Sequence, residues 1–317
     1  MYAAIDLGGT TITAALAEGS GKIVAERTSA TDSHEGPDGV LKRIARLINE
    51  LAATAGRKPL ALGMGVPGLV DFARGRTLFL PNLVTQWRNV AVAEVLAPLV
   101  GCPVYLLNDA RAATLGELVF GHGRAAGTMV FYTLGTGIGG GIVVDGKLRL
   151  GAVGAAGELG HQTVMVDGPL CGCGNRGCIE TLAAAPAVTG EGVRLMRSGL
   201  APKLWELARG GASAVNPKLM MEAAEAGDGN VREAILRALR YLGIGAANMV
   251  VALHPELIVY GGGMAAIGDL LTETVRAVIL DRVRMFPPDD VRVERSILGE
   301  RAGILGGIAL AMKEGKL

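Results

Sequence analysis

One histidine and three cysteines lie close together in the sequence and could hold a metal ion. His161 is followed by nine residues and then by Cys171, Cys173 and Cys178, which are three of the chain's four cysteines. One imidazole and three thiolates make a complete tetrahedral ligand set for zinc, and a closed set leaves no position for a catalytic water. The spacing therefore predicts a structural zinc site.

Disulfide bonding, or thiols that are merely buried, is the alternative interpretation of this cluster. Three cysteines cannot all pair with one another, and a bridge between Cys171 and Cys173 would be badly strained. Few cysteines, grouped as metal ligands, fit a reducing compartment. The first residues lack the basic segment of a secretory signal, so we expect a cytoplasmic protein.

A carboxylate at the end of an expected strand could act as a base. Asp109 follows the strand expected at 104–107 and precedes the helix expected at 110–119. Ligands of open α/β sheets gather at the carboxyl ends of strands, where an Asp can accept a hydroxyl proton during phosphoryl transfer. Asp is also a good helix N-cap, so position alone leaves base and cap equally open.

Two glycine-rich turns could cradle phosphate groups. Gly8-Gly9 joins strands expected at 2–7 and 11–17, and Gly135–Gly141 follows a strand expected at 128–134. Without Cβ atoms in the way, a phosphate can approach the main-chain N–H groups of such turns. The alternative is that each loop is only a tight β-turn.

The second loop also matches the G-x-G-x-x-G pattern of dinucleotide-binding folds. That motif requires a helix to begin at its third glycine. Here Ile142–Val144 reads as a strand and Asp145-Gly146 as a turn, so a dinucleotide fold is not expected. A P-loop is not expected either, because no G-x-x-x-x-G-K-[ST] stretch occurs.

The elements that must position these residues alternate between strand and helix. Ile5–Thr13 and Tyr132–Gly140 resemble each other, which suggests a duplicated α/β unit with two lobes. Asn230 and Glu233 resemble a capping box for the helix expected at 231–253, which His254-Pro255 should end. Further strands are expected at 22–28, 60–66 and 257–260, and further helices at 39–55, from Gly263 to about 283, and at 302–313.

Composition narrows the choice of partners. Lys and Arg number 31 against 30 Asp and Glu, so a nucleic-acid partner is not expected. Half of the residues are hydrophobic and only 4% are aromatic, so aliphatic side chains must fill the core. The uncharged stretch Ala125–Val144 could span a membrane by length, but its glycines and β-branched residues indicate strand, loop and strand instead.

Together these motifs resemble the ROK family (repressor, open reading frame, kinase) over essentially the whole chain. The strongest segments are Leu134–Gly141, Gly157–His161 and Cys171–Glu180. The resemblance implies an α/β, actin/hexokinase-like (ribonuclease H-like) duplicated two-lobe fold with a central cleft and a structural zinc site. It also implies a homo-oligomer, either a dimer or a tetramer.

The implied lobes are a small α/β lobe over 1–108, joined by the C-terminal helix 302–317, and a large α/β lobe over 109–301 that carries the zinc site. In the kinase branch, MgATP is the phosphoryl donor. Asn108 would contact the sugar and Asp109 would be the catalytic base.

The resemblance implies a role for other residues as well. The remaining sugar contacts would be Gly65, Asn82, Glu158, His161 and Glu180, so His161 would serve both zinc and sugar. The nucleotide would be held by Asp6, which lies near the Mg²⁺, and by Gly8, Gly9, Thr10, Thr11, Gly135, Thr136, Gly137, Gly261, Gly262 and Gly263.

The implied activity is ATP-dependent phosphorylation of a hexose at its 6-hydroxyl, with glucose as the expected substrate. N-acetylmannosamine, N-acetylglucosamine, fructose and allose are alternatives, because the shared motifs do not separate these sugars. A sugar-responsive repressor, the other branch, would carry a DNA-binding module ahead of the first strand; this strand begins at residue 2, so a repressor is not expected. A non-catalytic zinc protein is disfavoured because Asp109 and both glycine loops are intact.

Overall fold

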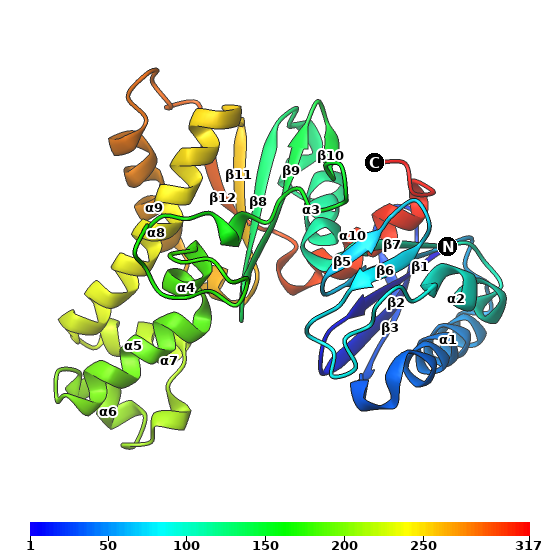
Figure 1. The fold of residues 1–317 in the computed structure, drawn as a ribbon, viewed down its shortest axis with the longest axis horizontal. Helices are drawn as coiled ribbons and strands as arrows, with labels where there is room; N and C mark the ends of the chain where they lie inside the picture. The colour runs from blue at the N-terminus through cyan, green and yellow to red at the C-terminus, as the bar shows by residue number, and fades with distance from the viewer. The chain divides into compact units, whose positions relative to one another are not determined.

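A computed structural model describes residues 1–317 (Figure 1). Internal contacts divide the chain into two compact units. Unit 1 comprises Met1–Ala126, Gly141–Gly157 and Ile297–Leu317, and unit 2 comprises Gly127–Gly140 and Glu158–Ser296. The expected lobe boundary between residues 108 and 109 remains a prediction; by contacts, the residues up to Ala126 group with the N-terminal part.

Unit 1 is built on a five-stranded sheet with the strand order β3-β2-β1-β4-β7. The chain starts with an antiparallel meander and then adds two strands parallel to the first. The strands are β1 (Tyr2–Leu7), β2 (Thr11–Ala17), β3 (Ile23–Ala30), β4 (Leu62–Val66) and β7 (Val104–Asn108), with a separate hairpin of β5 (Leu69–Asp71) and β6 (Arg76–Phe79). The strands predicted at 2–7 and 11–17 are confirmed to the residue.

The helices of unit 1 are α1 (Gly36–Ala55), α2 (Val92–Val100), α3 (Asp109–Phe120) and α10 (Ala302–Met312). α10 packs against β1, β4 and α3 at very short range, and this requires glycine. A Cβ at Gly63 would lie 2.0 Å from the Gly307 carbonyl oxygen, and one at Gly306 would lie 1.7 Å from that of Ala112. These glycines let backbones touch, and aliphatic residues fill the remaining core, as the low aromatic content predicts.

Unit 2 contains the parallel strands β8 (Met129–Leu134), β11 (Leu257–Gly261) and β12 (Arg292–Arg295). They belong to a sheet with the order β10-β9-β8-β11-β12, in which β9 (Ile138–Val144) pairs antiparallel with β10 (Lys147–Arg149). The expectation of a loop over 135–141 is wrong in its second half, because β9 already begins at Ile138. The Gly135 N–H donates to the Gly137 carbonyl oxygen at 3.0 Å, which closes the turn within three residues.

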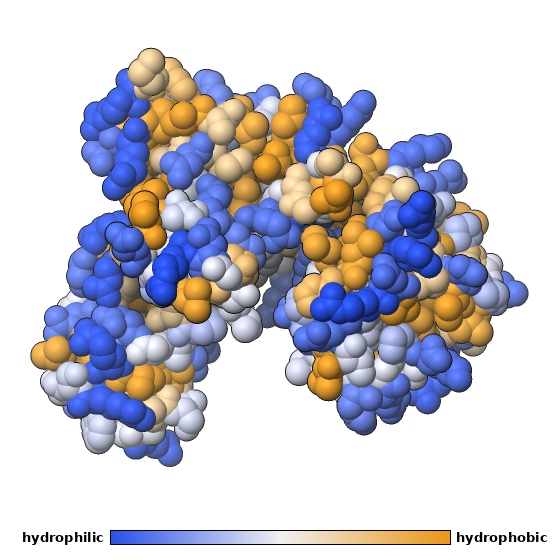
Figure 2. Space-filling view, in the orientation of Figure 1, coloured by the Kyte–Doolittle hydropathy of each residue, from blue (hydrophilic) through white to orange (hydrophobic).

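The helices of unit 2 are α4 (Ile179–Ala183), α5 (Ala185–Arg197), α6 (Pro202–Leu207), α7 (Pro217–Glu225), α8 (Gly229–Leu253) and α9 (Asp269–Arg282). Figure 1 shows α8 as the longest of them, with α9 alongside. By length and composition alone α8 could cross a membrane, yet 56% of its most apolar window is buried inside the protein, as in a core helix. Hydrophilic side chains cover much of the surface around α5 and α6 (Figure 2).

The capping box predicted at Asn230 and Glu233 is wrong. Helix α8 begins at Gly229, and the Asn230 amide donates instead to the Leu200 carbonyl oxygen at 3.0 Å. The buried Asp228 precedes the helix and accepts from the Leu204 N–H at 2.7 Å, which ties the starts of α6 and α8 together. A tertiary contact therefore replaces the local cap. The predicted stop at His254 is confirmed, with His254 in the left-handed conformation at φ 43°.

Candidate active site

Three neighbouring parallel strands of unit 1 end side by side at one edge of the sheet. Asp6 on β1 is in register with Gly65 on β4, and Val66 on β4 is in register with Asn108 on β7. A Cβ at Gly65 would lie 3.5 Å from the Asp109 Cα and 3.8 Å from the Asp6 Oδ1. The sheet register therefore brings these predicted site residues together, and burial raises the pKa of the Asp6 carboxyl.

The N-cap of α3 is Asn108, and this bears on the role of Asp109. The Asn108 Oδ1 accepts from the Ala110 N–H at 3.0 Å and from the Arg111 N–H at 3.2 Å. Asp109 is the first residue of the helix, and its Oδ1 accepts from the adjacent Ala110 N–H at 2.8 Å. Asn108, and not Asp109, is therefore the N-cap of α3.

The first glycine turn is held by a residue that sequence reasoning missed. No motif in the sequence marks Thr31, which is buried. Its hydroxyl donates to the Gly8 carbonyl oxygen at 2.8 Å, and its N–H donates to the Thr10 carbonyl oxygen. Gly9 approaches Asn82 so closely that a Cβ would lie 2.9 Å from the Asn82 carbonyl oxygen. The predicted residues Gly8, Gly9 and Asn82 are therefore neighbours in unit 1.

The two glycine loops of unit 2 also meet. They follow the neighbouring parallel strands β8 and β11, where Thr133 is in register with Gly261. Gly262 has φ 81°, and a Cβ on it would lie 2.4 Å from the Leu134 carbonyl oxygen. Only glycine fits this left-handed, crowded position. Thr136 and Gly263 belong to the same two loops.

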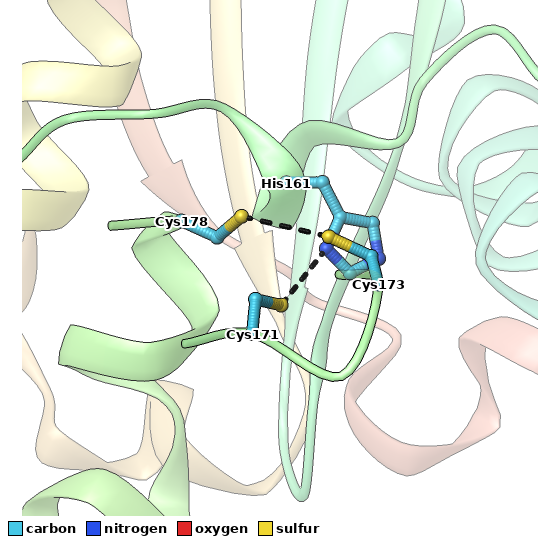
Figure 3. A group of neighbouring side chains, drawn as sticks. All are labelled: His161, Cys171, Cys173 and Cys178. Atoms are coloured by element: carbon cyan, nitrogen blue, oxygen red, sulfur yellow. Dashed lines mark hydrogen bonds between the residues drawn. The ribbon is translucent and has the colours of Figure 1, made fainter. Parts of the chain in front are cut away.

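The four predicted metal ligands converge, as Figure 3 shows. His161 ends the short helix Leu159–His161, Cys171 and Cys173 lie in the following loop, and Cys178 directly precedes α4. Their ligand atoms all lie within 4.8 Å of one another. The Cys173 and Cys178 sulfurs are 3.8 Å apart, and the Cys171 sulfur is 3.6 Å from the His161 Nδ1.

These separations fit the donor set for zinc. With Zn–S bonds of about 2.3 Å, neighbouring ligands of a tetrahedron are about 3.8 Å apart. The loop reaches this geometry through Gly174 (φ 92°) and Gly177 (φ 65°), where a Cβ at Gly177 would lie 1.5 Å from the Met165 carbonyl oxygen.

The thiols differ in their readiness to ionise. Burial raises the pKa of Cys178 to about 12 and also raises the pKa of Cys171. A hydrogen bond from the Asn175 main chain lowers the pKa of the exposed Cys173. Because metal ligands must lose their protons, a cation binding here would displace protons from the two buried thiols.

Two carboxylates of unit 2 contact the metal-ligand group. The Glu158 Oε2 lies 3.9 Å from the His161 Nε2, whereas the other ring nitrogen, Nδ1, is the one near the Cys171 sulfur. The Glu180 Oε1 lies 3.8 Å from the Cys171 sulfur. A carboxylate on the second ring nitrogen of a metal-bound histidine orients the ring and raises its basicity.

The ROK family model matches residues 2–314. The chain belongs to the ROK family. It is 37% identical to a glucokinase of Thermotoga maritima over 312 residues, which cover 96% of this chain and 95% of the relative.

Both a repressor and a second glucokinase are among the ROK relatives. A xylose repressor of Caldicellulosiruptor bescii is 32% identical, and the match covers 98% of this chain but 77% of the repressor. The ROK glucokinase of Streptomyces griseus, solved with glucose and AMPPNP, is 32% identical with a TM-score of 0.83, and the match covers 98% of this chain and 99% of that one. The relatives support a two-lobe ROK sugar-kinase fold, as the sequence motifs predicted.

Proposed function

We propose that this ROK protein is an ATP-dependent hexose kinase that phosphorylates the 6-hydroxyl, with glucose as its substrate. The glucokinase relatives support a sugar kinase, and the related structure with glucose and AMPPNP supports binding of a sugar and ATP. The observation that carries the finer proposal is the position of Asp109 directly after β7, beside Gly65, with Asn108 as the helix cap.

Asp109 is the general base of the proposed reaction. Its carboxylate accepts the proton of the sugar's 6-hydroxyl while that oxygen bonds to the γ-phosphorus of ATP. The bond from the γ-phosphorus to the bridging oxygen breaks, and ADP leaves. Main-chain N–H groups of the glycine loops stabilise the charge on the phosphates.

The nucleotide is held by the three glycine loops and by Asp6 and Thr11. Asp6 suits a place near a cation, since its carboxylate is buried and its charge would be offset there. Bound Mg²⁺ neutralises charge on the transferring phosphoryl group.

The proposed sugar contacts are hydrogen-bonding groups at Gly65, Asn82, Asn108, Glu158, His161 and Glu180. Hydrogen-bonding side chains of this kind reject sugars that lack a matching hydroxyl, because they would leave a buried polar group unpaired.

A structural zinc ion held by His161, Cys171, Cys173 and Cys178 is part of the proposal. The spacing of the donor atoms supports it. With His161 Nδ1 on the metal, its Nε2 remains for Glu158 or a sugar hydroxyl, so one residue can serve both purposes.

The test is ADP release from MgATP with glucose, mannose, fructose, allose, glucosamine, N-acetylglucosamine and N-acetylmannosamine. Asp109→Asn should lose about 10²–10⁴-fold in turnover, because Asn cannot accept the proton. Asp269→Asn is the matched control, because Asp269 is also the first residue of a helix and lies on the exposed surface.

The outcomes separate the candidate functions. Turnover that depends on Asp109 and is highest on glucose supports the full proposal, and preference for another sugar corrects the substrate alone. An Asp109→Asn variant as active as wild type contradicts the base assignment. Sugar binding without turnover on any member of the panel would favour a regulatory role like that of the xylose repressors.

A further inference from the structure

A buried arginine lies directly beneath the proposed sugar contact Asn108. Arg111 is 1% exposed, and its Nη1 donates to the Asn108 Oδ1 at 2.8 Å. Its Nε donates to the Ala156 carbonyl oxygen at 2.9 Å, and its Nη2 donates to that of Ala155 at 3.0 Å. One guanidinium thus joins the start of α3 to the segment before Gly157, all within unit 1.

The position of this charge is unfavourable for the helix by itself. Arg111 lies in the first turn of α3, where the helix dipole disfavours a cation. Burying a guanidinium also requires that its charge and its donors be satisfied. Capping of α3 does not require Arg111, because Asn108 already accepts from two main-chain N–H groups.

The contacts of Arg111 fix which end of the Asn108 carboxamide can meet a ligand. The Asn108 oxygen accepts from three N–H groups, two from Arg111 and one from Ala110, which saturates its lone pairs. The amide nitrogen donates to the Gly68 carbonyl oxygen at 3.2 Å and has a second N–H. Toward a ligand, therefore, Asn108 is a hydrogen-bond donor.

We propose that Arg111 is a positioning residue of the sugar site, which locks Asn108 as a donor to one sugar hydroxyl and fixes the Ala155-Ala156 segment. The inference rests on the proposed function, since it assigns a hydrogen-bond direction to one of its sugar contacts. The hydroxyl that meets Asn108 accepts from the protein, so its own proton is available to another acceptor.

The first test measures the Michaelis constants of Arg111→Lys and Arg111→Met. Lysine keeps the charge but cannot donate in three fixed directions, and methionine keeps much of the length without any donor. We expect the KM for the sugar to rise about tenfold in both, as for the loss of a charge-assisted hydrogen bond, while the KM for ATP changes less than about twofold. Arg124→Met is the matched control, because Arg124 donates to the Phe120 carbonyl oxygen at the other end of α3.

The second test asks whether Arg111 acts through Asn108. In an Asn108→Ala background, Arg111→Met should add less than about a twofold further rise in the sugar KM, because residues of one hydrogen-bonded unit are not additive. Full additivity would show that Arg111 does not act through Asn108. Equal rises in the KM for the sugar and the KM for ATP, together with a fall in melting temperature, would show a structural role and overturn the inference. Failure of both Arg111 variants to fold while the Arg124→Met control folds would overturn it as well.

Hydrogen exchange gives a readout that needs no turnover. The N–H groups of Ala110 and residue 111 both donate to Asn108, so they should exchange faster in Arg111→Lys than in wild type and Arg124→Met. A wild-type protein inactive on every sugar would contradict the proposed function alone. Unchanged exchange with unchanged sugar KM in an active enzyme would contradict this inference alone.

Discussion

The Glu180 carboxylate accepts a hydrogen bond from the Ile138 main-chain N–H at 2.9 Å, which ties helix α4 to the start of β9. The other carboxylate oxygen lies 3.8 Å from the sulfur of Cys171. A single side chain therefore bridges the metal-ligand group and the glycine turn that precedes β9. A change that moves Glu180 should therefore affect both the metal-ligand group and this glycine turn.

Gly137→Ala should displace Glu180. A Cβ at residue 137 would lie 2.6 Å from the Glu180 Oε2. Glycine therefore leaves space for this carboxylate, and its backbone is not in the left-handed conformation. We expect the melting temperature to fall, with a loss of about 0.5–1.5 kcal/mol for the hydrogen bond between Ile138 and Glu180, and the sugar KM to rise.

Gly135→Ala is the control for that stability change, because a Cβ there meets nothing within 4 Å. Equal melting temperatures for the two variants would show that Gly137 does not hold space for Glu180.

Removal of the proposed zinc should destabilise the segment from Glu158 to Glu180. Elemental analysis should find one zinc per chain, and a chelator should remove it with a fall in melting temperature, since structural zinc contributes directly to folding. Cys173→Ser should have the same effect, because Cys173 is the exposed ligand of the set. Cys102→Ala is the control, as Cys102 is buried elsewhere in unit 1. Full zinc content in Cys173→Ser would exclude the proposed ligand set.

Two helical glycines should respond to alanine with opposite signs. Gly306→Ala places a Cβ 1.7 Å from the Ala112 carbonyl oxygen, which α10 and α3 cannot relieve without moving apart. We expect a loss of about 1–3 kcal/mol or more in the free energy of unfolding. Gly190→Ala in α5 meets nothing within 4 Å and should stabilise by about 0.5–1 kcal/mol. Denaturant unfolding measures both, and a neutral Gly306→Ala would contradict the close packing.

Glu191 should stabilise the protein at neutral pH but not in acid. Hydrogen bonds from Arg194 and then Arg237 lower the pKa of Glu191 to about 2. Because the folded-state pKa lies below the unfolded value, the stabilisation is full above about pH 4.5 and is lost as the pH falls toward about 2.

Glu191→Gln should therefore lower the free energy of unfolding by about 1–2 kcal/mol at pH 7, with the difference shrinking through that window. The exposed pair of Lys203 and Glu206 supplies the control variant, Glu206→Gln, with an expected change of less than about 0.5 kcal/mol. A difference for Glu191→Gln that is independent of pH would indicate a packing effect instead.

Chemistry that is local in sequence could be predicted from the sequence. His161 and the three cysteines lie within a short segment, so ligand type and spacing were enough to predict their convergence. The strands β1 and β2 and the Gly-Gly turn between them are also local, and both strands were predicted to the residue. The capping box at Asn230 failed for the opposite reason, because its amide found a partner thirty positions away in sequence.

Other features depend on partners that lie far apart in the chain. The sequence by itself determined the alternation of strands and helices, the grouping of His161 with three cysteines and the family, because each rests on neighbouring residues or on a short motif. Only the tertiary structure decided that Asn108, not Asp109, caps α3, and that Arg111 joins Asn108 to Ala155 and Ala156. The physical reason is that a buried polar group must find partners wherever packing places them, and packing brings together residues whose separation along the chain carries no signal.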